Sequence, residues 1–493
     1  MLRAVQLDDE QRYRAVQSKD SRFDGWFVTA VRTTRIYCRP SCPALTPRPE
    51  NTSFYLTAAA AQDAGYRACR RCRPDTVPGS AAWDVRADTA ARAVRLIGDG
   101  LVDREGVPGV ATRLGYSVRQ LQRVLADELG ASPLALARAQ RAHTARVLLE
   151  TTTMPLGDVA YAAGFGSVRS FNDAVRSAYA LTPGELRTRL RRSPSPAAGG
   201  LGALELRLPL RLPFDASNLF GHLAATGVPG VEEWRGGAYR RTLALPHGPG
   251  IVALSPRHDH VAATVWLTDP RDLTPAISRC RRLLDMDADP VAVTEVLGAD
   301  PVLAPLVTAV PGRRVPRSPD GDEFAIRAVL GQQVSTAAAR TQTGRLVARL
   351  GAPVHDPAGG LTHLFPSMAV LATLQPSDVP GPRHRAETLI RLAAALASGD
   401  LELGPGADRF EARRLLAALP GIGPWTVELV AMRALGDPDA FPSGDLGIVR
   451  AADALGIEGL VAASECWRPW RSYATQYLWA TLPHPINHLP EEP

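Results

Sequence analysis

Four of the six cysteines fall within 35 residues as two close pairs, Cys38-x3-Cys42 and Cys69-x2-Cys72. A zinc ion bound by thiolates needs four soft ligands at the corners of a tetrahedron, and each short loop supplies two of them. The N-terminus lacks a signal-peptide pattern and the chain has no apolar stretch of about eighteen residues, so the pairs indicate a metal site rather than disulfides. We expect one zinc ion per chain, in a small α+β module over 1–78.

The length of the chain, 493 residues, leaves room for three or four folded units at roughly 100 to 200 residues per domain. The segment 191–200 is rich in proline, glycine and serine and has the composition of a linker. A weaker break of the same kind lies at 74–80. The sequence therefore predicts a multidomain protein that divides near 1–78, 80–192 and 201–493.

Charge is distributed unevenly between these parts. Residues 1–192 contain 29 Lys and Arg against 19 Asp and Glu, a net charge of +10, whereas the remainder contains 27 against 31, a net charge of −4. A basic front end favours a polyanion as partner, and the acidic remainder can bind one only through a local patch or through backbone amides. We expect no membrane partner and a cytoplasmic location. The isolated Cys280 and Cys466 are expected to be small buried side chains.

The middle part contains an internal repeat with an offset of about fifty residues. Residues 110–117 and 159–166 share a Val-Ala-x-x-x-Gly-aromatic pattern, and an amphipathic run and a Ser-Pro or Thr-Pro pair follow each copy. A short helix, a turn at glycine (Gly115, Gly164) and a longer helix make a helix-turn-helix, whose second helix can enter the major groove. A plain helical bundle with charged faces is the alternative. Candidate DNA-contacting residues are Arg119, Gln120, Arg123, Arg169 and Asn172.

Two family resemblances follow from these motifs. The doubled pattern resembles the DNA-binding domain of AraC-type regulators, which implies an all-α domain over 80–192. The segments 27–42 and 68–75 closely resemble the N-terminal domain of Ada-type methylation-response proteins. The resemblance implies that Cys38 is the nucleophile, that the other three cysteines complete the zinc site, and that Arg39, Arg70 and Arg71 contact DNA.

The chemistry implied for this module is stoichiometric removal of a methyl group from a DNA methylphosphotriester, as in a suicide methyltransferase. A neutral phosphotriester needs a strong thiolate nucleophile, which zinc coordination supplies at neutral pH. Methylation of Cys38 makes the site less negative by one unit, so the affinity for DNA is expected to rise. A purely structural zinc site is the alternative. No Pro-Cys-His-Arg motif occurs, so we expect no transfer from O6-alkylguanine.

The C-terminal part carries a glycine hairpin, Pro420-Gly421-Ile422-Gly423-Pro424, between two helical patterns at 410–419 and 425–433. Glycines let bare backbone amides approach a phosphate closely, and a helix N-terminus lies behind them. This arrangement is typical of a helix-hairpin-helix. It explains how an acidic region binds DNA through Gly421 and Gly423.

The hairpin is followed by Phe441-Pro-Ser-Gly-Asp445, and the combination resembles 3-methyladenine DNA glycosylase II of the AlkA type. The resemblance covers about 204–482, including 328–335 and 467–474, and implies a linker at 193–203, an α+β subdomain at 204–310 and an all-α glycosylase domain at 311–493. It makes Asp445 the catalytic carboxylate and Gln333 the wedge that replaces an extruded base. Trp425 and Trp479 match pocket aromatics, and Leu429 stands where that family has a pocket tyrosine. The alternative role of Asp445 is a helix N-cap.

A lysine Schiff base, which gives related glycosylases a lyase activity, is excluded by composition. Lys19 is the only lysine, and Trp425 occupies the position at which bifunctional relatives carry theirs. We expect a monofunctional glycosylase with no iron–sulfur cluster. No cofactor is expected for it beyond a structural cation at the hairpin.

The sequence thus predicts an alkylation-damage protein with three functions: methyl acceptor, DNA-binding regulator and glycosylase. Expected partners are alkylated duplex DNA, promoter DNA and RNA polymerase, with a monomeric, nucleoid-associated chain. One alternative is a methyl-responsive transcription regulator with a catalytically silent glycosylase half. A zinc-dependent hydrolase is disfavoured, because four cysteine ligands leave no open position for water.

Overall fold

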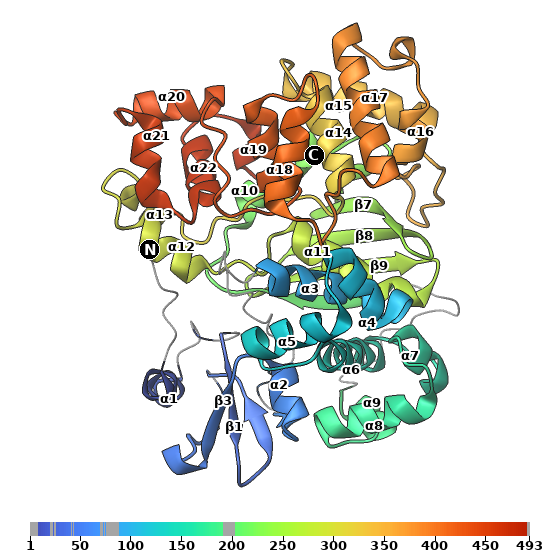
Figure 1. Ribbon diagram of the computed structural model, residues 1–493, viewed down its shortest axis with the longest axis vertical. Helices are drawn as coiled ribbons and strands as arrows, with labels where there is room; N and C mark the ends of the chain where they lie inside the picture. The colour runs from blue at the N-terminus through green and yellow to red at the C-terminus, as the bar shows by residue number, and fades with distance from the viewer. Residues whose placement is uncertain are drawn as a thin grey trace. The chain divides into compact units, whose positions relative to one another are not determined.

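The structure is a computed structural model, and it describes residues 8–19, 23, 26–40, 42, 44–69, 72, 74, 88–190 and 203–490. The chain forms two compact units (Figure 1): unit 1 is Met1–Pro209 with Leu267–Ser278, and unit 2 is Leu210–Trp266 with Arg279–Pro493. The linker expected at 193–203 and the break at 74–80 lie almost entirely outside the described residues. Among the described helices, none combines the length and apolar character that a membrane span requires.

The N-terminal part of unit 1 is a small α+β module. Its four-stranded sheet has the order β3-β1-β2-β4, in which β1 is antiparallel to β2 and β3, and β2 is parallel to β4. The rings of Phe27 and Phe54 pack edge to face with centroids 5.5 Å apart, in one apolar cluster with Ala15 and Val16 of α1. The elements are α1 (Asp9–Gln17), β1 (Val28–Val31), β2 (Ile36–Cys38), β3 (Thr52–Tyr55), α2 (Ala58–Asp63) and β4 (Arg67–Ala68).

The remainder of unit 1 before β5 (Leu204–Pro209) is helical. Ser117, Ser132 and Ser167 cap helices by accepting a hydrogen bond from the backbone three residues on. Gly115 and Gly164 adopt positive φ values of 74° and 84°, as the two predicted turns require. The helices are α3 (Asp88–Gly98), α4 (Leu101–Leu114), α5 (Val118–Leu129), α6 (Pro133–Thr151), α7 (Leu156–Ala162), α8 (Val168–Tyr179) and α9 (Pro183–Leu190).

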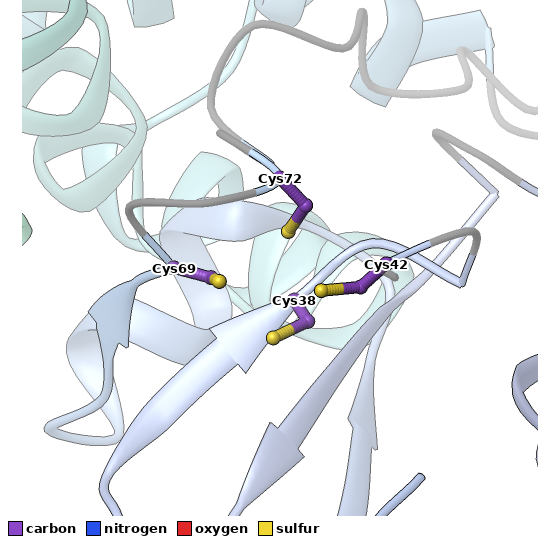
Figure 2. Close-up of side chains that lie close together, drawn as sticks. All are labelled: Cys38, Cys42, Cys69 and Cys72. Atoms are coloured by element: carbon purple, nitrogen blue, oxygen red, sulfur yellow. The ribbon is translucent and has the colours of Figure 1, made fainter. Parts of the chain in front are cut away.

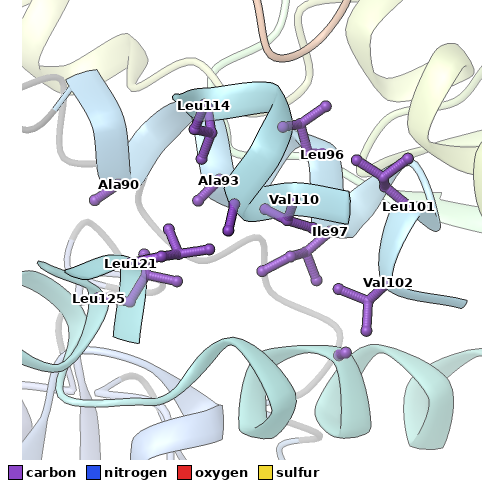
Figure 3. Close-up of a cluster of buried hydrophobic side chains, with 12 residues drawn as sticks. Ala90, Ala93, Leu96, Ile97, Leu101, Val102, Val110, Leu114, Leu121 and Leu125 are labelled. Atoms are coloured by element: carbon purple, nitrogen blue, oxygen red, sulfur yellow. The ribbon is translucent and has the colours of Figure 1, made fainter. Parts of the chain in front are cut away.

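Helical spacing buries one face of each second helix of the repeat. Leu121 and Leu125 of α5 are fully buried in a cluster with residues of α3, α4 and α6 (Figure 3). In the second copy, Phe171 of α8 is fully buried and packs against Phe165 with ring centroids 5.6 Å apart. The two predicted helix-turn-helix units are therefore α4–α5 and α7–α8.

Unit 2 begins with the β-rich region that the sequence predicts. Its strands lie in the order β9-β8-β7-β6, with β7 antiparallel to β6 and to β8. The strands are β6 (Glu232–Arg235), β7 (Ala238–Leu245), β8 (Gly248–Pro256) and β9 (His260–Leu267), and the first helix of the unit is α10 (Ala216–Thr226).

Helices make up the rest of the chain after β9. Helix α14 packs against both α17 and α19, and α18 packs against α19. The helices are α11 (Leu273–Leu283), α12 (Pro290–Leu297), α13 (Ala304–Ala309), α14 (Gly321–Leu330), α15 (Thr336–Leu350), α16 (Met368–Ala372), α17 (Arg383–Ser398), α18 (Arg409–Ala418), α19 (Pro424–Arg433), α20 (Leu446–Ala454), α21 (Leu460–Ala463) and α22 (Arg471–Ala480).

Candidate functional site

The four cysteines of the N-terminal module form one cluster (Figure 2), in which the four sulfur atoms all lie within 4.8 Å of one another. The parallel pairing of β2 with β4 places Tyr37 opposite Ala68, and the Cys69 N–H donates to the Tyr37 carbonyl at 2.9 Å. Cys38 and Cys69 therefore leave neighbouring strands side by side. The Cys42 N–H donates to the Arg39 carbonyl at 3.1 Å and so returns the chain to the cluster.

The donor set of this cluster fits zinc. Cys42 and Cys72 are buried, whereas Cys38 and Cys69 are half-buried. Hydrogen bonds with the other three cysteines, of which the one with Cys42 has the largest effect, raise the pKa of Cys38. Hydrogen bonds with the same group of cysteines, of which the one with Cys38 has the largest effect, lower the pKa of Cys69. Four thiols held this close together offer four soft donors, and a dication that binds such donors can replace their protons.

The arginines of the module differ in their placement. Arg35 has a positive φ of 54°, and its guanidinium lies 5.4 Å from the centroid of the Tyr66 ring. Arg39, directly after Cys38, is half-buried. Arg70 and Arg71 lie outside the described residues, so the structure says nothing about these two expected DNA contacts.

The candidate DNA-contacting residues of the repeat lie on the second helix of each unit. Arg119, Arg123 and Arg169 are exposed, and Asn172 is half-buried. Gln120 is exposed too, but its side-chain oxygen accepts hydrogen bonds from the Ser117 N–H at 3.1 Å and from the Ser117 hydroxyl at 2.9 Å. Gln120 therefore completes a capping box at the start of α5.

Asp445 is the N-cap of α20, and it has further partners besides. Its Oδ1 accepts from the Gly447 and Ile448 N–H groups at 2.9 and 3.1 Å. The indole Nε1 of Trp479 donates to the same oxygen at 2.9 Å, and the Nε1 of Trp425 donates to Oδ2 at 2.9 Å. The structure thus brings three predicted site residues together around one half-buried carboxylate.

The two tryptophans reach Asp445 from different helices. Trp425 lies in the first turn of α19, and Trp479 lies near the end of α22. Leu429 is half-buried one turn after Trp425 on α19, the side of the helix on which Trp425 lies. A Cβ atom on Gly447 would lie 3.1 Å from Cδ1 of Trp479, so this glycine leaves room for the indole.

The hairpin between α18 and α19 has a conformation that requires glycine at one position. Gly421 has φ +90°, and a Cβ there would lie 2.0 Å from the hydroxyl of Thr388, which donates to the Pro420 carbonyl at 3.1 Å. Gly423 has φ −89° and precedes α19, and a Cβ there would meet no described atom within 4 Å. Both glycines are exposed, so their backbone is accessible to a ligand.

The predicted wedge, Gln333, lies in the loop between α14 and α15, where it is exposed and has a positive φ of 56°. The residue before it, Gln332, was not singled out by the sequence. Its Nε2 donates to the Gly421 carbonyl and to the Thr426 hydroxyl, each at 3.1 Å. The sequence does show two adjacent glutamines at 332 and 333. It does not show that Gln332 bonds to Gly421 and Thr426, which lie about ninety residues away in the chain.

The two isolated cysteines differ from each other. Cys280 is 2% exposed, and burial raises the pKa of its thiol to about 12, as expected for a small core side chain. The expectation was wrong for Cys466, which is exposed. Its thiol donates to the Ala463 carbonyl and to Asp300, because it lies in the short 3-10 turn after α21 rather than on a buried helix face.

Three protein families match successive parts of the chain. Residues 11–75 match the metal binding domain of Ada, residues 110–189 match a helix-turn-helix domain, and residues 205–320 match the AlkA N-terminal domain. The first match, with the clustered sulfurs, confirms the expected zinc site. The order of the three matches confirms the predicted multidomain fold class.

Individual relatives agree with this order. The chain is 58% identical over 489 residues to the probable bifunctional transcriptional activator/DNA repair enzyme AlkA of Mycobacterium tuberculosis, covering 98% of this chain and 99% of that protein. DNA-3-methyladenine glycosylase 2 of Escherichia coli is 33% identical over 55% of this chain and 94% of its own length. The bifunctional transcriptional activator/DNA repair enzyme Ada of Escherichia coli is 38% identical over 30% of this chain and 40% of its own length. The chain therefore belongs to the family of bifunctional transcriptional activator/DNA repair enzymes AlkA, in which an Ada-type metal-binding domain and a helix-turn-helix domain precede an AlkA-type glycosylase region.

Proposed function

We propose that residues 204–482 form a monofunctional DNA glycosylase that releases 3-methyladenine and related alkylated bases. The observation that carries this proposal is the placement of Asp445, whose carboxylate is held by the indole N–H groups of Trp425 and Trp479. An acidic group fixed between two aromatic rings suits a cationic, electron-poor base and the positive charge that develops on its sugar.

The reaction assigned to this site is hydrolysis of the N-glycosidic bond. The bond between C1′ and the base nitrogen breaks, its electron pair leaves with the already cationic base, and a water oxygen bonds to C1′ and releases a proton. Asp445 stabilises the oxocarbenium-like sugar and directs the water. Trp425, Trp479 and Leu429 line the pocket, and Leu429 in place of a tyrosine sets the breadth of base selection.

DNA contacts of the glycosylase are assigned to three residues. The exposed backbone at Gly421 and Gly423 binds a phosphate, and Gln333 fills the stack that the extruded nucleotide has left. No lyase step follows base release, because Lys19 is the only lysine and lies far from Asp445 in the sequence.

For the N-terminal module we propose stoichiometric methyl transfer from a methylphosphotriester to Cys38. The sulfur of Cys38 forms a bond to the methyl carbon, the carbon–oxygen bond of the triester breaks, and the phosphate leaves as an ordinary diester anion. Bound zinc would hold the sulfurs of Cys38, Cys42, Cys69 and Cys72 as thiolates at neutral pH. Cys38 and Cys69 are half-buried whereas Cys42 and Cys72 are buried, so the sulfur of Cys38 is among the two more accessible ones, and the resemblance to the Ada-type domain assigns it the role of acceptor.

Residues 80–192 are proposed to bind promoter DNA through α5 and α8, with RNA polymerase as a further partner and a monomeric chain. Arg119, Arg123 and Arg169 are exposed on these helices, which supports phosphate or base contacts. Gln120 reaches a base only if its capping-box bonds open. Methylation of Cys38 would raise the affinity of the N-terminal part for DNA.

A base-release assay tests the glycosylase directly. Methylated duplex DNA is incubated with the intact protein and with Asp445→Asn, and free 3-methyladenine and 7-methylguanine are quantified. Release that depends on Asp445 supports the proposal. No release from the folded wild-type protein would instead leave a methyl-responsive regulator with a silent glycosylase half.

A further inference from the structure

We propose that Gln332 is a positioning residue that fixes the wedge loop, residues 331–334, to the glycine hairpin, so that base extrusion and phosphate binding occur on one rigid surface. This inference rests on the glycosylase function proposed above. It assigns a role to a residue that touches neither the carboxylate of Asp445 nor its two indole partners among the contacts described.

The side chain of Gln332 makes both of its donor bonds to the hairpin and the helix behind it. Its Nε2 donates to the Gly421 carbonyl at 3.1 Å and to the Thr426 hydroxyl at 3.1 Å. Gly421 is the turn residue with φ +90°, and Thr426 is a buried residue in the first turn of α19. One amide group therefore joins two segments that lie 89 residues apart in the sequence. These segments are the wedge loop and the glycine hairpin, which carry the exposed residues Gln333 and Gly421.

The backbone of Gln332 is held as well. Arg385 of α17, which is 5% exposed, donates from Nη2 to the Gln332 carbonyl at 2.7 Å. Thr388, one turn later on α17, donates to the Pro420 carbonyl. Helix α17 thus contacts both the wedge loop and the glycine hairpin. The side chain of Gln332 adds a direct bond between these two loops.

These bonds determine where the wedge lies. Gln333 has a positive φ of 56°, a conformation that non-glycine residues adopt only where the surroundings hold it. Because the preceding residue is fixed by side chain and carbonyl, Gln333 is projected from a loop that is already immobilised. The wedge and the phosphate-binding hairpin must engage the same DNA together, so a fixed distance between them favours the extruded state over the stacked one.

The predicted effect of losing Gln332 is confined to extrusion. Single-turnover base release is measured with an oligonucleotide that carries one 7-methylguanine, paired either with cytosine or with a tetrahydrofuran abasic analogue. The second duplex holds its target base unpaired, so extrusion is easier. Gln332→Leu is expected to lower the rate about tenfold on the paired target and no more than about twofold on the unpaired one, as the loss of two hydrogen bonds predicts.

Two further variants sharpen this test. Thr426→Val removes one of the two acceptors and keeps the bond to Gly421, so its loss on the paired target is expected to be smaller than that of Gln332→Leu. Combined with Gln332→Leu, it should add nothing further, because both changes remove the same bond. Gln342→Leu on α15 is the matched control, since the Gln342 side-chain oxygen has no hydrogen-bond partner among the described residues.

Several outcomes separate the possibilities. Equal losses on both duplexes, or a matching fall in melting temperature, would show that Gln332 only stabilises the fold and would overturn the inference. Unchanged rates in Gln332→Leu would overturn it too. Failure of the wild-type protein to release 7-methylguanine from either duplex, together with no release of 3-methyladenine from methylated DNA, would instead overturn the glycosylase function itself.

Discussion

The indole Nε1 of Trp425 donates to Oδ2 of Asp445 at 2.9 Å, whereas Oδ1 of Asp445 accepts from the Trp479 indole and from the backbone N–H of Gly447 at the start of α20. An asparagine at 445 would turn an NH2 group or a neutral oxygen toward these donors. We expect Asp445→Asn to lower base release by at least about a hundredfold, as loss of a preorganised charge at a reaction centre does.

The measurement is release of 7-methylguanine under single-turnover conditions, with binding to abasic-site DNA measured in parallel. Asp453→Asn, a change of the same kind at an exposed position on α20, is the control and should retain full activity. Retained activity in Asp445→Asn would remove this carboxylate from the mechanism.

Replacement of Cys38 by alanine is expected to abolish methyl transfer while base release continues at the wild-type rate. Cys38 belongs to the sulfur cluster of unit 1, and Asp445 belongs to unit 2. Transfer is followed with DNA that carries radiolabelled methylphosphotriesters, by counting label on the protein. Cys280→Ala is the control, because that buried thiol should accept no methyl group. Label on Cys38→Ala would assign the acceptor to another sulfur.

Removal of zinc with a chelator is expected to inactivate methyl transfer and to unfold the N-terminal module. The module has a small core, and zinc bound by the four thiolates would cross-link the two loops that follow β2 and β4. Circular dichroism and base release are recorded before and after treatment, and readdition of zinc should restore transfer. Transfer by protein shown to be free of metal would contradict the thiolate mechanism.

The two hairpin glycines are expected to respond differently to alanine. Gly421→Ala forces a side chain into φ +90° and against Thr388, so it should lower the free energy of unfolding by about 1 to 3 kcal/mol and weaken DNA binding. Gly423→Ala meets open space and should keep its stability while still weakening DNA binding, because a methyl group stands between backbone and phosphate. Melting curves and DNA titrations of both variants check this difference. Equal stability of the two would contradict the turn assignment.

The stability of unit 2 is expected to fall as pH rises from about 4 to 7, through Asp322. Burial raises the pKa of Asp322 to about 7, with smaller contributions from Asp320 and Glu402. The folded state therefore holds a proton that the unfolded chain has released above its ordinary pKa of about 3.9, and this favourable contribution disappears as the folded group ionises.

Asp322→Asn removes that titration. The variant is expected to melt at a higher temperature than the wild type at pH 8 and at a similar temperature at pH 4.5. Asp453→Asn, at an exposed position, should follow the wild type at both pH values. If the melting temperatures of Asp322→Asn and the wild type change in parallel with pH, Asp322 does not dominate the pH dependence of stability between pH 4.5 and 8.

The sequence predicted those features that arise from local spacing. Cys38-x3-Cys42 and Cys69-x2-Cys72 predicted the cluster because short loops constrain their ligands. The amphipathic run after Gly115 predicted the helix face on which Leu121 and Leu125 are buried. Gly421 was predicted as a turn residue for the same local reason.

Contacts between segments that are distant in the sequence could not be predicted from the spacing of residues. Nothing near Trp425 or Trp479 in the sequence indicates that their N–H groups meet on Asp445, because that meeting depends on how α19, α20 and α22 pack. The bonds of Gln332 to the hairpin depend equally on packing. Cys466 was predicted to be buried from residue type alone. It is exposed because it lies in a turn at the surface.

The pairing of β2 with β4 also has a consequence for synthesis of the chain. β2 ends at Cys38 and Cys42 follows four residues later, while β4 and the second cysteine pair come about thirty residues after β2. Until β4 and the second cysteine pair have been made, β2 lacks its parallel neighbour and the nascent module has half of its ligands. Folding of this module and acquisition of its metal are therefore expected to become a single event, which requires that both cysteine pairs have been made.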